Sequence, residues 1–85
     1  MKSSTALVDE ARRCAQLFRL GRDIEAALVM VDLVDAAAPL FSSSEPQQQA
    51  WTQVLGAVLH CQGRQDWIGV ADWLEYEMVD LLQQH

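Results

Sequence analysis

The sequence is poor in residues that interrupt or cross-link secondary structure. Its 85 residues include only four glycines, two prolines and two cysteines. Cys14 and Cys61 are too few and too irregularly placed for a disulfide framework or a zinc site, so we expect them to be buried free thiols. With 51% hydrophobic residues and so little glycine and proline, the chain is expected to be globular rather than disordered.

Long apolar runs and basic residues are also scarce. The longest apolar stretch, AALVMVDLVDAAAPLF, is interrupted by Asp32 and Asp35 and falls short of the roughly 20 residues that span a membrane. The first residues, MKSSTALVDEARR, lack the apolar segment of a signal peptide, so we expect a cytoplasmic protein without membrane insertion. Six lysines and arginines stand against twelve acids, a net charge of −6, which argues against nucleic acid as a partner. Five of the six cations lie in residues 1–22, where we expect them to pair with acids on adjoining helices.

Apolar residues recur at helical spacing in four segments that begin at capping residues. The first follows the hydroxyl groups of residues 3–5 and ends at Gly21, and the second runs from about residue 23 to residue 38. The third opens on a capping box, Ser44 with Gln47, and stops at Gly63, and the fourth runs from the N-cap Asp66 to about residue 82. The pattern predicts an all-α single domain (1–85) of four helices, arranged as two stacked αα-hairpins at about 4–40 and 44–83.

The second segment is apolar almost all round. Its acids Glu25, Asp32 and Asp35 form a narrow stripe, which predicts a helix covered on several sides, with Leu28 in the core. A Gly-Arg pair recurs in each half, at residues 21–22 and 63–64. This weak internal repeat predicts that the two hairpins stack so as to cover the second helix.

The fourth segment places its large aromatics on two sides. At about 100° per residue, one face forms a predicted core stripe comprising Trp67, Val70, Ala71, Leu74, Met78, Leu81 and Leu82. Trp73 and Tyr76 point away from this stripe, with Gly69 between them and Asp72 and Asp80 at the border. These five residues are the predicted partner-binding face. Two alternatives stay open: the PLFSSSEP loop or the N-terminal segment covers the aromatics, and Gly69 serves packing within the chain instead of close approach of a partner.

The sequence predicts no catalytic residue, metal ligand or cofactor site. His60 and His85 are far apart, and neither stands at metal-ligand spacing from a cysteine or an acid. No serine, histidine and acid are spaced as an activated nucleophile, and no glycine-rich loop follows a strand to hold a phosphate. We therefore expect a protein that is not an enzyme.

Two stretches carry a likeness to a known family. AWTQVLGAVLHCQGRQDWIGVA resembles the helix-turn-helix of tetratricopeptide repeats, and LGRDIEAALVMVDLVDAAAP is similar to the repeat's second helix and closing proline. The residues at or near signature positions are Trp51, Leu55, Gly56, Gly63, Trp67 and Ala71. By size, charge and helicity the chain also resembles small acidic bacterial secretion and flagellar export chaperones.

The aromatic face and the absence of catalytic motifs predict a non-catalytic module that binds another protein, with binding of a second copy of itself as the simplest case. In its most concrete form the protein is a small acidic chaperone or adaptor for a secretion or flagellar protein, acting through the aromatic face of the fourth segment. The alternative is a small regulator or enzyme with a ligand pocket that the sequence does not reveal.

Overall fold

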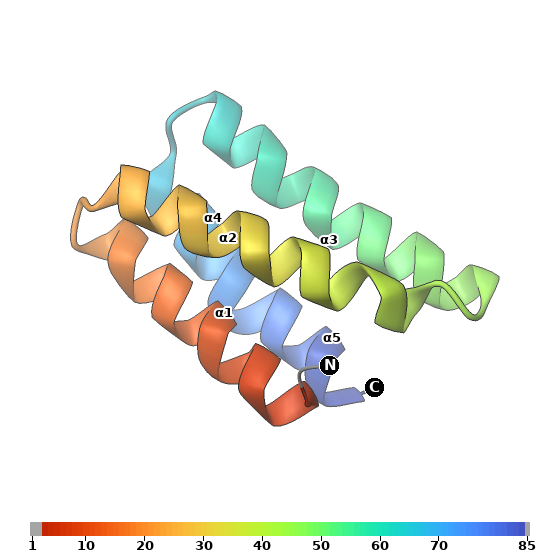
Figure 1. Cartoon of the computed structure of the whole chain (residues 1–85). Coiled ribbons are helices and arrows are strands. Elements are labelled where there is room, and N and C mark those ends of the chain that lie inside the picture. The colour runs from red at the N-terminus through yellow and green to blue at the C-terminus, as the bar shows by residue number, and fades with distance from the viewer. Residues whose placement is uncertain (1–2, 85) are drawn as a thin grey trace.

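The computed structural model describes residues 3–84, and within that range the chain is helical, with no strand (Figure 1). The elements are α1 (Ser4–Arg19), α2 (Asp23–Ala37), the 3₁₀ turn η1 (Ala38–Phe41), α3 (Glu45–Gly63), α4 (Trp67–Asp72), the π-helical turn η2 (Trp73–Met78) and α5 (Val79–Gln84). The last three follow without a break and are called the last helix, residues 67–84. The all-α class with four helices is confirmed.

Local capping explains where the helices begin and end. The Ser3 hydroxyl accepts from the Ala6 amide (3.2 Å), and the Asp66 carboxylate accepts from the Gly69 amide (3.0 Å). Gly21, at φ 76°, supplies the left-handed residue after α1. After α3 the left-handed residue is Gln65, at φ 58°, although the helix ends at the predicted glycine.

The two hairpins stack through α1. This helix packs against α2, its hairpin partner, and also along the last helix, which in turn packs on α3. Figure 1 shows α2 and α3 on the same side of the α1 and α4–α5 layer. The buried side chains of all these helices form one apolar cluster. Two stacked aromatic pairs mark its ends: Phe18 with Trp67 (ring centroids 5.6 Å apart) and Phe41 with Trp51 (5.1 Å).

The prediction that α2 is covered on several sides is wrong. Ala26, Met30, Leu33 and Ala37 are buried, but Ile24, Leu28 and Val31 are 77%, 67% and 57% exposed. Within the described residues, α2 packs chiefly on α1 and η1, and its neighbour α3 does not close over it. When the two halves are aligned on their Gly-Arg pairs, with one extra residue in the second half, Val31 corresponds to Leu74. Val31 is exposed while Leu74 is fully buried, so the proposed repeat does not extend to packing.

The last helix departs from the predicted core stripe after its π-helical turn. Trp67 is half-buried against Phe18, and Leu74, Met78 and Leu82 are fully buried, as predicted. Val79 is buried and Leu81 only half-buried, the reverse of the expectation. A π-turn accommodates an extra residue, which turns the residues after it back by about 100° relative to an uninterrupted α-helix.

Among the described residues, no helix combines the length and the apolar character required to span a bilayer.

Candidate functional site

The predicted aromatic face is partly assembled in the structure. Asp72, Trp73 and Tyr76 line a shallow depression of about 180 Å³ together with Glu77. Tyr76 is 62% exposed, whereas Trp73 is half-buried and packs against the core. Asp80 lies one turn further along, and its Oδ2 atom accepts a hydrogen bond from the side-chain Nε2 of Gln84 (2.9 Å). Only one of the two aromatics is therefore open to a partner over most of its surface.

Gly69 is enclosed by its own chain. A Cβ at this position would clash with Asp66 Oδ2, and it would lie 2.8 Å from Asp66 Cγ and 3.1 Å from Cys61 Sγ. The glycine thus leaves room for the carboxylate that caps the last helix. This geometry supports intramolecular packing, one of the two interpretations of Gly69 that the sequence left open.

Arg19 ties α1 to the last helix. Its Nη2 atom lies 2.9 Å from Asp72 Oδ1 and 3.0 Å from Glu75 Oε2. The hydrogen bonds that Arg19 donates to Glu75 and Asp72 raise the pKa of Arg19, and the one that Glu75 accepts lowers the pKa of the Glu75 carboxyl. The predicted pairing of the cations of residues 1–22 with acids on an adjoining helix is confirmed for Arg19, whereas Arg22 pairs with Glu25 only three residues along (3.0 Å). Asp72 therefore has an internal partner.

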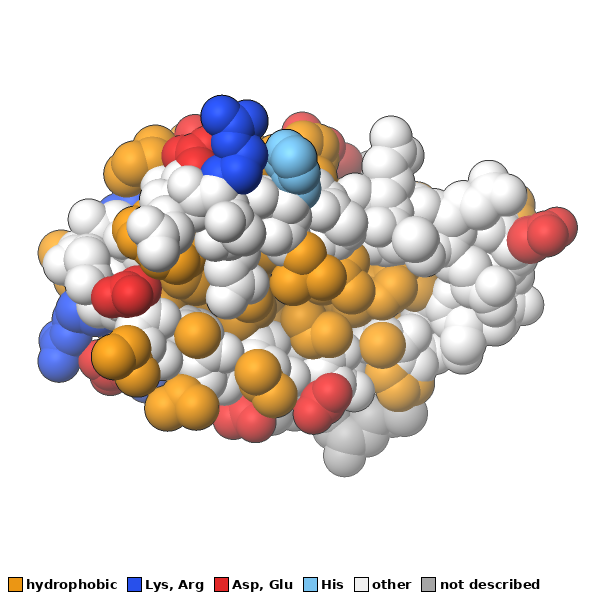
Figure 2. Space-filling model, turned by 90° about the horizontal axis from the view of Figure 1, so that it is seen from above, with side chains coloured by type: hydrophobic (Ala, Val, Ile, Leu, Met, Phe, Trp, Pro, Cys, Tyr) orange, Lys and Arg blue, Asp and Glu red, His pale blue; other side chains and the backbone are white. Residues whose placement is uncertain are grey.

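An apolar groove between α2 and α3 was not predicted. It encloses about 260 Å³ and is called the α2–α3 groove. Its lining comprises Met30, Val31, Val34, Asp35, Leu55 and Leu59. Figure 2 shows this face as a hollow with hydrophobic atoms along its floor, between two ridges of the molecule. The groove is the most apolar hollow that we find in the described part of the chain.

The groove continues onto an exposed apolar row on α2. Ile24, Leu28 and Val31 follow one another at spacings of four and three residues, so they lie on one face of the helix. Leu59, on the opposite wall, is also more than half exposed. The sequence signal for this surface was the all-round apolar character of α2, which exceeds what one buried face requires.

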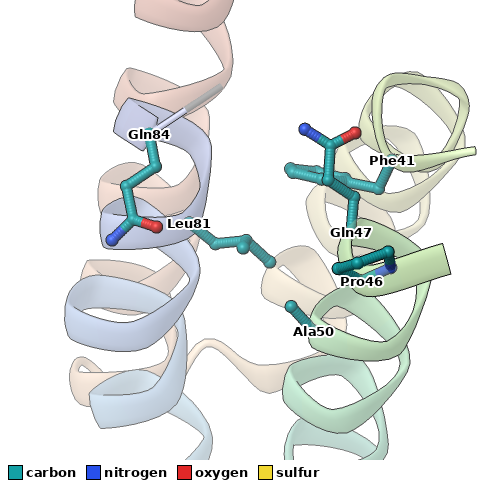
Figure 3. Close-up of a pocket in the computed structure, with 6 residues that line it drawn as sticks. All are labelled: Phe41, Pro46, Gln47, Ala50, Leu81 and Gln84. Atoms are coloured by element: carbon teal, nitrogen blue, oxygen red, sulfur yellow. The ribbon is translucent and has the colours of Figure 1, made fainter. Parts of the chain in front are cut away.

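A second hollow lies at the other end of α3 (Figure 3). Phe41, Pro46, Gln47, Ala50, Leu81 and Gln84 line this crevice of about 220 Å³. In Figure 3, Leu81 reaches from the last helix toward Pro46 and Ala50 on α3. None of its six lining residues is ionisable, so none is equipped for acid-base or nucleophilic chemistry.

Residues with reactive or metal-binding side chains are dispersed. Within residues 3–84, no three of the His, Cys, Asp and Glu side chains are grouped to hold a metal ion. His60 is exposed, and His85 lies outside the described residues. Burial raises the pKa of the Cys14 thiol to about 12, and this thiol donates to the Ala26 carbonyl oxygen (3.3 Å). Cys14 is buried as expected, while Cys61 is half-buried.

No protein-family model, curated protein or solved structure matches the chain.

Proposed function

We propose that this protein is a non-catalytic module that binds another polypeptide through the α2–α3 groove and the apolar row beside it. The observation that carries the proposal is the exposure of Ile24, Leu28 and Val31 next to an apolar hollow. Large apolar side chains gathered on one face of a small protein are typical of an interaction surface. Covering the exposed part of each side chain, which is 57–77% of it, would contribute about 1–2 kcal/mol of hydrophobic free energy.

A polypeptide suits the groove better than a small ligand. Ligand pockets usually enclose about 300–1,000 Å³ and combine an apolar lining with several convergent polar groups. The α2–α3 groove is slightly smaller, and Asp35 is its one ionisable lining residue. These features support the non-catalytic interpretation over the alternative of a small enzyme or regulator with a ligand pocket.

The aromatic face of the last helix is a second, smaller candidate surface within the same function. Tyr76 offers an exposed ring there, while Trp73 also serves the core. The narrower form of the proposal is a cytoplasmic chaperone or adaptor for a bacterial secretion or flagellar protein. It rests on the likeness to tetratricopeptide hairpins and to export chaperones.

A matched pair of substitutions separates the two surfaces. Leu28→Gln and Tyr76→Gln each replace an apolar side chain of similar exposure, 67% and 62% respectively. Affinity capture from native cells with the wild type and both variants, quantified by mass spectrometry, tests the proposal. We expect a partner that is retained by the Tyr76 variant and depleted about 10-fold or more with the Leu28 variant, as for a hot-spot residue.

Two other outcomes are informative. Depletion by the Tyr76 variant alone would transfer the function to the aromatic face. Capture of the same proteins in equal amounts by all three forms would contradict partner binding through either surface.

A further inference from the structure

We propose that the occupant of the α2–α3 groove is a single amphipathic helix of a partner protein, apolar on the buried side and basic on the flank that faces α2. This inference rests on the proposed function and specifies its partner class. Three observations carry it: the secondary structure around the groove, its length and its charge.

The first observation concerns the mode of recognition. Addition of a strand requires an exposed sheet edge, and residues 3–84 contain no strand. Proline-rich segments dock in grooves lined by aromatic rings, whereas the walls and floor here are formed by Met30, Val31, Val34, Leu55 and Leu59. A trough between two helices with aliphatic walls fits a third helix, whose apolar residues recur at spacings of three and four.

The second observation is the length of the trough. On α2 the apolar row and the groove lining together extend from Ile24 to Asp35, which is 12 residues or about 18 Å of helix. On α3 the lining residues are Leu55 and Leu59, one turn apart, and Figure 1 shows α2 and α3 spreading apart with distance from η1. A partner helix of about 12 residues or more can therefore contact the apolar row and the groove along their combined length.

The third observation is that the charges beside the groove have one sign. α2 carries Asp23, Glu25, Asp32 and Asp35 and no basic residue. Among the described residues, Asp32 and Asp35 form no ion pair, and Asp35 lines the groove itself. On the other wall, residues 46–63 of α3 contain no Asp, Glu, Lys or Arg.

This distribution of charge around the groove favours one class of partner over another. A helix with lysine or arginine on the flank facing α2 would meet unpaired carboxylates, which gives specificity and faster association. A second copy of this chain brings the same acids instead, and α2 and residues 46–63 of α3 contain no lysine or arginine and a single histidine, His60, to pair with them. Charge complementarity therefore favours a basic helix over self-association.

Synthetic helices test the proposal. The probe is a fluorescein-labelled peptide of about 18 residues, with leucine at positions i, i+3, i+4 and i+7 of each repeat and lysine on the adjoining flank. Two controls are a scrambled peptide of identical composition and an amphipathic peptide with glutamate in place of lysine. Fluorescence anisotropy on titration with the full chain measures binding. We expect the basic amphipathic peptide to bind at least about 10-fold more tightly than either control.

Variants of the protein locate the contact. Leu28→Gln should weaken binding of the basic peptide about 10-fold, as expected for a buried apolar contact residue. The double change Asp32→Asn with Asp35→Asn should weaken it about 5-fold and reduce its salt dependence. Asp9→Asn with Glu45→Gln removes the same charge from exposed positions outside both candidate surfaces and should leave the affinity within about 2-fold.

The possible results distinguish the partner class from the proposed function. If the acidic or the scrambled peptide binds as tightly as the basic one while Leu28→Gln still weakens binding, the groove binds protein but the basic partner class is wrong. If the basic peptide binds the wild type and Leu28→Gln equally, both proposals fall. A dimer in analytical ultracentrifugation that Leu28→Gln dissociates would overturn the basic helix in favour of a second copy.

Discussion

Leu28 and Leu33 belong to the same helix, yet the structure predicts opposite consequences for changing them. Leu28 is 67% exposed, whereas Leu33 is completely buried. Replacing each by glutamine leaves the net charge and, to a good approximation, the helix propensity unchanged. The two variants therefore differ only in how much of the side chain the fold removes from water.

The expected costs follow from this difference. Leu28 has about a third of its side chain covered, so Leu28→Gln should cost about 0.5–1 kcal/mol out of the 1.5–3 kcal/mol for a fully buried leucine. Leu33→Gln loses that whole contribution and also buries an amide without partners, which together amount to about 3–6 kcal/mol. A domain of this size has about 4–13 kcal/mol of total stability, so the second variant loses a large part of it.

Urea denaturation followed by far-ultraviolet circular dichroism measures both changes at equilibrium. We expect the unfolding curve of Leu28→Gln to lie near that of the wild type, with the curve of Leu33→Gln strongly displaced or lost. If Leu28→Gln destabilised the protein as much as Leu33→Gln, the outer face of α2 would be covered in solution. The apolar row could then not serve as a free binding surface.

Three further predictions concern the last helix and the buried thiol. A glycine-to-alanine change inside a helix usually stabilises it by about 1 kcal/mol, but Gly69→Ala should not, because the added Cβ displaces the capping carboxylate of Asp66. In an Asp66→Ala background the same change should stabilise the protein. Equal effects of Gly69→Ala in both backgrounds, measured by urea denaturation, would contradict the contact between Gly69 and Asp66. Because the pKa of Glu75 is lowered in the folded protein, its ion pair contributes to stability above the pKa of the unfolded state and ceases to do so as the pH falls through the pKa of the folded state. In Arg19→Gln the free energy of unfolding should therefore fall less steeply with decreasing pH. An unchanged NMR titration of the Glu75 carboxyl in that variant would count against the ion pair. With its pKa raised to about 12, Cys14 should react with a disulfide reagent at about pH 8 only after unfolding, and reaction of both cysteines in the native protein would refute its burial.

The helices themselves could be predicted from the sequence because their signals are local. The N-cap residues Ser3, Ser44 and Asp66 each accept a backbone hydrogen bond in the first turn that follows. Gly21 takes the left-handed conformation that ends α1. Such interactions involve residues at most a few positions apart, so they depend little on the rest of the fold.

The faces of the last helix depended on more than helical spacing. The predicted core positions hold through α4 and as far as Met78, the last residue of the π-turn. Beyond the turn, Val79 takes the core position expected for Leu81. No residue type marks a π-turn in advance, and here the Arg19 contact with Glu75 lies inside it. Trp73 and Tyr76 lie within the same π-turn, so helical spacing alone does not fix the position of the aromatic face.

The sequence by itself determined that α2 would be an apolar helix, and the tertiary structure decided which of its sides would meet water. Leu33 and Leu28 are the same residue type on the same helix, and only the placement of α1 and η1 against one side of that helix distinguishes them. A helix that is apolar all round carries no periodic signal for the direction of its neighbours. The α2–α3 groove therefore arises from helices brought together in three dimensions, and it could not be predicted from spacing along the chain.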